Sequence, residues 1–136
     1  MLINEKIIKN VDTIYVDTPY NQEQYSRFYH ILETICKYDN PKLYFKAKYR
    51  DDRFKSNFCY KKKVFNEFTY ILDYACNNNI NLALSYSNKG IINIDDIANY
   101  AETLFKNVSL KKKDYSHSSQ GKGNKSIIEY LLICSI

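Results

Sequence analysis

The stretch Thr13-Ile14-Tyr15-Val16-Asp17-Thr18-Pro19-Tyr20 decides how this chain folds. Its first residues are β-branched or aromatic, as is typical of a strand. Pro19 lacks the backbone N–H that a sheet ladder needs, and it holds the residue before it extended. The sequence therefore predicts a strand over 12–17 that brings a carboxylate, a proline and an aromatic ring to its carboxyl end.

Helical and strand-like segments alternate along the rest of the chain. A short helix or turn is predicted over 3–10, and apolar residues at three- and four-residue steps predict helices over 22–37, 61–78 and 95–105. Apolar runs predict strands over 80–86, 108–115 and 126–133, the last two forming an antiparallel hairpin. Residues 42–60 have no clean period and predict a long loop with short extended pieces. This order indicates an α/β fold with a parallel sheet and an antiparallel edge.

The size and composition set limits on the function. The 136 residues suit one small domain or part of a larger one. No apolar run reaches the roughly 18 residues that cross a membrane, and the charged N-terminus is not typical of a signal peptide, so we expect a cytoplasmic protein without a membrane partner. The cysteines form no C-x-x-C pair, which favours free thiols over a metal site (Cys36, Cys59, Cys76 and Cys134).

Positive charge is concentrated in one segment. Residues 42–63 carry nine Lys or Arg and two Asp, a net charge of +7, whereas the whole chain carries +5. Tyrosine and phenylalanine are interleaved with these cations, a pattern that suits phosphates and bases together. The segment is therefore predicted to bind nucleic acid, with a solvated surface loop as the alternative. The candidate contacts are Lys46, Lys48, Arg50, Arg53 and Lys55.

The ends of two predicted strands suggest a second site. In parallel sheets, ligands bind beyond the carboxyl ends of the strands, where both 17–20 and 85–88 lie. The Asp17 carboxylate and the Thr18 carbonyl would accept two hydrogen bonds from one amino group. Pro19 would stiffen the turn, and Tyr20 would stack on a flipped base. Two such acceptors localise the nitrogen lone pair, so that it can attack a sulfonium methyl without a strong base.

Asp17-Thr18-Pro19-Tyr20 resembles the Asp-Pro-Pro-Tyr motif of amino-group DNA methyltransferases. Four further stretches resemble adenine-specific bacterial members in the family's order: YHILETI at 29–35, KYRDDRFKSNFCYKK at 48–62, LSYSNKGII at 84–92 and GNKSIIEYLLIC at 123–134. The resemblance covers nearly the whole chain, from Asp12 to Cys134. It implies a partial Rossmann-like methyltransferase fold, the C-terminal half of the sheet with its antiparallel terminal hairpin.

The resemblance also implies a reaction and its residues. The methyl group of S-adenosylmethionine would pass to the exocyclic amino group of a flipped adenine in DNA. Asp17 and the Thr18 carbonyl would hold that amino group, Tyr20 would stack on the adenine, and the basic loop would approach the DNA. The wall of the base pocket would come from Ser85, Tyr86, Ser87 and Asn88.

Two features depart from the family pattern. Thr18 stands where the family usually has proline, so the turn loses one fixed φ angle. The family's cofactor half has no counterpart here, because the G-x-G at 121–123 precedes a strand and not a helix. We therefore expect 1–136 to be a single partial methyltransferase domain with unknown cofactor-binding residues, as a gene fragment or a piece of a split enzyme.

Three alternatives stay open: a catalytically inactive nucleic-acid-binding remnant, a subunit that a separate cofactor-binding chain activates, and a methyltransferase of amino groups in structured RNA. Two structural expectations accompany them. The tyrosines of the helix at 22–37 and His30 are expected to lie in the core or a groove, with no catalytic role for His30. The strand at 12–17 is expected to leave one edge unpaired.

Overall fold

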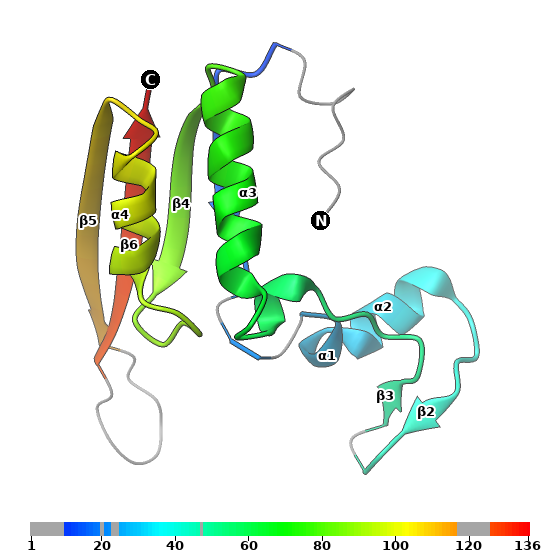
Figure 1. The fold of residues 1–136 in the computed structure, drawn as a ribbon. Coiled ribbons are helices and arrows are strands. Elements are labelled where there is room, and N and C mark those ends of the chain that lie inside the picture. The colour runs from blue at the N-terminus through cyan, green and yellow to red at the C-terminus, as the bar shows by residue number, and fades with distance from the viewer. Residues whose placement is uncertain (1–9, 20, 23–24, 47, 117–125) are drawn as a thin grey trace.

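The computed structural model describes residues 10–19, 21–22, 25–46, 48–116 and 126–136. Figure 1 shows a sheet with two helices on one face, and a smaller group of elements that extends away from it. In chain order the elements are β1 (Thr13–Asp17), α1 (Tyr25–Phe28), α2 (His30–Lys37), β2 (Leu43–Tyr44), β3 (Tyr49–Arg50), the 3-10 helix η1 (Asn57–Cys59), α3 (Val64–Asn77), β4 (Asn81–Ser87), α4 (Ile94–Glu102), β5 (Asn107–Ser116) and β6 (Ser126–Ser135).

The main sheet has the strand order β1-β4-β6-β5. β1 and β4 are parallel, whereas β6 runs antiparallel to both β4 and β5. The predicted α/β fold, with a parallel pair and an antiparallel terminal hairpin, is therefore confirmed. Among the residues that the structure describes, β1 pairs with β4 alone and so forms an edge of this sheet.

The core lies between this sheet and the helices α3 and α4. Val64, Phe68, Ile71, Leu72 and Ala75 recur at helical spacing along α3, and all five are buried. They pack on the inward residues of the strands, where buried side chains alternate along β4. Burial of each large apolar side chain contributes about 1.5–3 kcal/mol, so this layer supplies most of the fold's stability.

Polar contacts cap the start of α4 and join α4 to α3. The side chain of Asn93 accepts a hydrogen bond from the backbone N–H of Asp95 and so caps α4. The Tyr100 hydroxyl on α4 donates to the Asp73 carboxylate on α3 at 2.9 Å, and this bond raises the pKa of Tyr100. The predicted boundaries of both helices agree with the structure to within a few residues.

The described residues between 25 and 54 form a separate group, here called the satellite unit. It contains α1, α2 and the β2–β3 hairpin, and lies apart from the main sheet (Figure 1). The segment 42–60, predicted as a loop with short extended pieces, indeed holds only two-residue strands and η1. The helix or turn expected over 3–10 falls, except for Asn10, outside the described residues.

The helix predicted over 22–37 differs from the structure in two ways. It is divided at Tyr29, whose ψ of 20° bends the chain between α1 and α2. More importantly, α2 has no buried residues, and Ile31, Leu32 and Ile35 are each more than half exposed. The expectation that the tyrosines of this helix lie in the core was wrong for Tyr25 and Tyr29, which are exposed as well.

Candidate functional site

Asp17 and Ser85 lie side by side at the ends of neighbouring strands. Asp17 is the last residue of β1, and the parallel register aligns it with Ser85 of β4. The preceding pair, Val16 and Leu84, is buried in the core. Because side chains alternate along a strand, Asp17 and Ser85 point to the opposite face of the sheet, away from α3 and α4. Asp17 is exposed there, so its carboxylate is open to a ligand.

The residues after Asp17 turn inward. Thr18 is only 6% exposed, and its hydroxyl has no hydrogen-bond partner among the described residues. Such a group is unusual, because a buried hydroxyl without a partner costs about 1–3 kcal/mol. Pro19 is half-buried. Tyr20, the predicted stacking residue, lies outside the described residues.

The second predicted segment is 85–88, and its side chains lie partly in the core and partly at the surface. Tyr86 was expected to wall a base pocket, but it is 1% exposed and its ring packs edge-on against Phe68. Burial raises the pKa of its hydroxyl, which accepts a hydrogen bond from the backbone N–H of Ile92. Ser87 is buried too, and its hydroxyl accepts from the N–H of Lys89. Of the four residues, Ser85 and Asn88 are therefore the more accessible.

Asn88 pins the turn after β4 to the start of β6. Its backbone N–H donates to the carbonyl of Ile128 at 2.9 Å, and its side-chain Oδ1 accepts from the Ile128 N–H at 3.2 Å. Both hydrogen bonds fix the chain just beyond Ser85. The turn therefore has one defined position relative to the carboxyl end of β1.

Gly90 is required by the buried Tyr86 ring. A Cβ at position 90 would lie 2.1 Å from Cε1 of Tyr86 and 2.5 Å from its hydroxyl oxygen. The ring thus occupies the space that any other residue would fill. The hydrogen bond from the Gly90 N–H to the Ser87 carbonyl, at 2.8 Å, closes the turn. The role of Gly90 was not predicted from the sequence, in which the available signal is a glycine four residues after a strand tyrosine.

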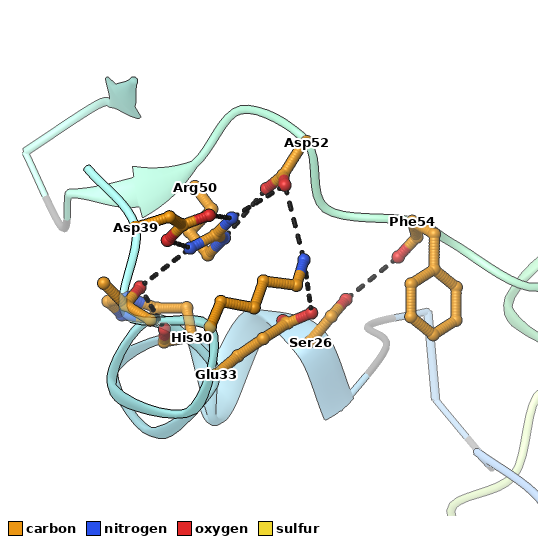
Figure 2. Close-up of polar contacts among 9 residues, drawn as sticks. Ser26, His30, Glu33, Asp39, Arg50, Asp52 and Phe54 are labelled. Atoms are coloured by element: carbon orange, nitrogen blue, oxygen red, sulfur yellow. Dashed lines mark hydrogen bonds and ion pairs between the residues drawn. The ribbon is translucent and has the colours of Figure 1, made fainter. Parts of the chain in front are cut away.

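An ion-pair cluster, here called the clasp, organises the satellite unit (Figure 2). The Arg50 guanidinium lies between two carboxylates, with Nη1 and Nη2 donating to Asp39 at 2.5 and 2.7 Å and Nε and Nη2 donating to Asp52 at 2.9 and 2.8 Å. Nη1 also donates to the Thr34 hydroxyl at 3.3 Å. These bonds use all five N–H donors of the guanidinium.

Arg50 was predicted to contact nucleic acid, but the structure gives it a different environment. Its side chain is 2% exposed, and every donor is directed at a protein group. No donor is left for a phosphate oxygen, so we assign Arg50 to the clasp. The sequence shows the charge of Arg50 but not its pairing with Asp39, which lies eleven positions away.

The clasp shifts the ionisation of its members. Hydrogen bonds from Arg50 hold the pKa of Asp39 below its usual value and lower that of Asp52 to about 2. The same bonds raise the pKa of Arg50. Lys37 extends the cluster to Glu33 at 3.2 Å and Asp52 at 3.4 Å, and the hydrogen bond to Glu33 raises its pKa. The shifted pKa values keep Lys37, Asp39, Arg50 and Asp52 charged near neutral pH.

The other predicted nucleic-acid contacts remain on the surface. The Arg53 guanidinium lies 5.1 Å from the Tyr49 ring centroid, and the Lys55 ammonium lies 4.8 Å from that of Tyr60. Cations on ring faces of this kind are held in place without losing their charge. Lys46 and Lys48 are exposed near the tip of the β2–β3 hairpin.

An open groove lies between α2 and the hairpin. It encloses about 400 Å³ and has a mainly aliphatic floor with two lysines among its lining residues: His30, Ile31, Thr34, Ile35, Leu43, Lys46 and Lys48. His30 stacks edge-on against Tyr49, with ring centroids 5.3 Å apart, as expected for a groove histidine. The groove therefore combines apolar surface with positive charge.

Two further observations concern the cysteines and the length of the helices. The four cysteines are free, and burial raises the pKa of the Cys134 thiol to about 11. Within the described part of the chain, no helix has the length and apolar character needed to cross a membrane.

Comparison with known proteins confirms the resemblance to adenine-specific DNA methyltransferases. The family model of the D12 class N6 adenine-specific DNA methyltransferases matches residues 3–116. The type II methyltransferase M.FokI of Planomicrobium okeanokoites is 40% identical over 87 residues, 63% of this chain and 13% of that protein. The modification methylase StsI of Streptococcus sanguinis is 33% identical over 134 residues, 94% of this chain and 20% of that protein.

The relatives are longer than this chain. The type II methyltransferase M.NlaIII of Neisseria lactamica is 31% identical over 136 residues, which is 94% of this chain but 40% of that protein. This chain thus spans less than half the length of each of these three relatives. No solved structure matches it. Since the family model covers most of the chain, the chain belongs to the D12 class of N6 adenine-specific DNA methyltransferases.

Proposed function

We propose that this chain supplies the target-base side of a site-specific DNA adenine methyltransferase, which methylates the N6 amino group of an adenine flipped out of the duplex. The observation that carries the proposal is the alignment of Asp17 with Ser85 at the carboxyl ends of two parallel strands. In parallel sheets this edge is where ligands bind. DNA is the partner, and the cytoplasm is the expected location.

The proposed chemistry rests on hydrogen-bond acceptors. The Asp17 carboxylate and the Thr18 carbonyl would each accept one N–H of the adenine amino group. Two acceptors draw the nitrogen toward tetrahedral geometry and localise its lone pair, which is otherwise conjugated with the ring. Asp17 acts here through position and charge, so no general base is needed. Tyr20 would stack on the flipped adenine, and Ser85 and Asn88 would border it.

The methyl donor of the proposed reaction is S-adenosylmethionine, which supplies an electrophilic methyl group. The described residues do not fit this cofactor, because they contain no glycine-rich turn between a strand and a helix. The segment after β1 is the Thr18-Pro19 turn, which belongs to the base site. We therefore propose that the cofactor is held by other polypeptide, either covalently joined to this domain or in a separate chain.

Methylation of DNA in cells tests the proposal. The chain is expressed, together with the part of M.NlaIII that it does not cover as the source of the cofactor-binding polypeptide, in a bacterial host without adenine methylation. N6-methyladenine in the genomic DNA is then measured by mass spectrometry. Asp17→Asn keeps the shape of the side chain but removes its charge, and should lower methylation by about 100-fold or more. Asp12→Asn, an exposed carboxylate just before β1, is the matched control and should leave methylation unchanged.

A catalytically inactive nucleic-acid-binding remnant is the second candidate. It is favoured by the poor fit to the cofactor and by the concentration of cations in 42–63. Calorimetric titration of the purified chain with S-adenosylmethionine, with and without an adenine-containing duplex, shows whether the chain binds the cofactor by itself. No heat with the cofactor, together with salt-sensitive DNA binding, would leave the remnant and the split enzyme. Absence of methylation when the cofactor-binding polypeptide is co-expressed would then establish the remnant.

A further inference from the structure

The clasp and Lys37 offset part of the acidic charge that would otherwise repel DNA. Asp39 and Asp52 are both engaged by Arg50, and Glu33 is engaged by Lys37. Lys46 and Lys48 form no ion pair with any residue that the structure describes. Glu33, Asp39 and Asp52 are therefore paired within the satellite unit, while the hairpin tip keeps its positive charge.

The clasp also attaches the hairpin to α2. Arg50 lies in β3, opposite Leu43 of β2, and the backbone N–H of Asp51 donates to the Lys42 carbonyl at 3.0 Å. From β3 the guanidinium reaches the Thr34 hydroxyl on α2 and Asp39 just beyond that helix. Arg50 thus joins the hairpin to the helix that forms the groove floor, and so sets where Lys46 and Lys48 stand.

We propose that the Asp39–Arg50–Asp52 clasp is a positioning device for DNA binding, which holds Lys46 and Lys48 over α2 so that two phosphates of duplex DNA lie along the groove. This rests on the proposed function, in which DNA is the substrate. The cationic edge complements a phosphate backbone, and the aliphatic floor of Ile31, Ile35 and Leu43 suits the apolar faces of deoxyriboses. Arg50 is a positioning residue in this arrangement and touches no phosphate.

The proposal predicts that removal of an acidic residue of the clasp weakens DNA binding, whereas a change of net charge alone would strengthen it. Removal of an acidic residue normally strengthens binding to a polyanion, because net positive charge rises. Asp39→Asn should instead weaken binding, because Arg50 loses a charged partner and the hairpin is no longer held over α2. Arg50→Lys should weaken it too, since a lysine keeps the charge but cannot bridge two carboxylates.

The experiment measures the affinity of the full chain for a fluorescent 25-base-pair duplex by anisotropy over a series of salt concentrations. For Lys46→Gln/Lys48→Gln we expect weaker binding and a salt slope shallower by about 2, one for each lost phosphate contact. Lys111→Gln/Lys112→Gln on β5 is the control with the same change of charge. Asp39→Asn should lower affinity by about 10-fold at 50 mM salt, an effect of about 1.4 kcal/mol.

The matched control for Asp39→Asn is Asp51→Asn. Asp51 is exposed, lies beside the clasp and is not a partner of Arg50 in it, so its removal should leave affinity equal or slightly higher. Equal effects of Asp39→Asn and Asp51→Asn, or of the two lysine pairs, would overturn the proposal. Far-UV circular dichroism and the urea midpoint check that each variant has folded.

Two outcomes separate this inference from the proposed function. If the wild-type chain does not bind the duplex, DNA is the wrong partner and both fail. If polyglutamate displaces DNA and binds with the same dependence on Lys46 and Lys48 but more tightly, the groove takes an acidic polypeptide and only this inference fails.

Discussion

The main sheet and the satellite unit are stabilised by different interactions. The sheet and its helices bury a continuous apolar cluster that includes Val64, Phe68 and Leu82 at 0% exposure. In the satellite unit the largest buried side chain is Arg50, a cation, while α2 exposes its isoleucines and leucine. Hydrophobic burial thus dominates the first region, and hydrogen-bonded ion pairs organise the second.

This difference predicts that salt and pH affect the satellite unit more than the main sheet. Apolar packing depends little on salt and pH, and it unfolds cooperatively. Ion pairs with exposed partners are weakened by salt and by protonation, and each contributes little to global stability. We therefore expect the satellite unit to loosen first, with the sheet and helices still folded.

Removal of a core ring should have the largest effect. Phe68 is fully buried and packs edge-on against both Phe58 and Tyr86. Phe68→Ala should therefore lower the free energy of unfolding by about 3–5 kcal/mol, measured by urea denaturation. Phe45→Ala, at a 70% exposed ring in the satellite unit, should change it by less than about 0.5 kcal/mol. Similar losses for the two variants would contradict the comparison.

An added methyl group at Gly90 should have the next largest effect. Gly90→Ala places a Cβ against the Tyr86 ring, and such overpacking costs about 1–3 kcal/mol. Lys89→Ala, one position earlier and exposed, is the control. If the ring is the cause, Tyr86→Leu combined with Gly90→Ala should cost less than the sum of the single variants. Simple additivity would exclude the ring contact as the cause.

Acid should open the satellite unit before the core. The pKa of Asp52 is about 2 in the fold, below its ordinary 3.8, so the clasp is fully stabilising above about pH 4 and is lost as the pH falls through 2. The Arg50 Nε–H signal in NMR spectra should report this loss, since Nε donates to Asp52. The double variant Asp39→Asn/Asp52→Asn should lack the transition. Loss of the core signals at the same pH would show that the two regions unfold together.

The sequence predicted the core well because periodicity and burial agree there. The apolar positions of 61–78 became the buried face of α3, and the alternation over 80–86 became β4. The same kind of pattern over 22–37 led to a wrong prediction of burial in the core. Periodicity shows that a helix is amphipathic, but it does not show what covers the apolar face. No described element buries that of α2.

The part of the candidate site that lies at the ends of strands could be predicted from the sequence. The Pro19 stop and the parallel register together place Asp17 beside Ser85, as expected from segments that follow two strand ends. The side chains of Tyr86 and Arg50 were not predictable, since a tyrosine or an arginine in the printed sequence is equally consistent with an exposed contact and a buried partner. Only the three-dimensional contacts with Phe68 and Asp39 distinguish these cases.

The hydrogen bond that closes the base of the satellite unit affects the entropic cost of changing the length of this unit. Ser26 is buried and donates from its hydroxyl to the carbonyl of Phe54 at 2.9 Å, so the chain leaves and re-enters the body of the fold at one point (Figure 2). An excursion whose two ends meet can lengthen at small entropic cost, because loop closure depends only on the logarithm of length. A change of chain length between Ser26 and Phe54 should therefore cost little loop-closure entropy and leave the pairing of the main sheet unchanged.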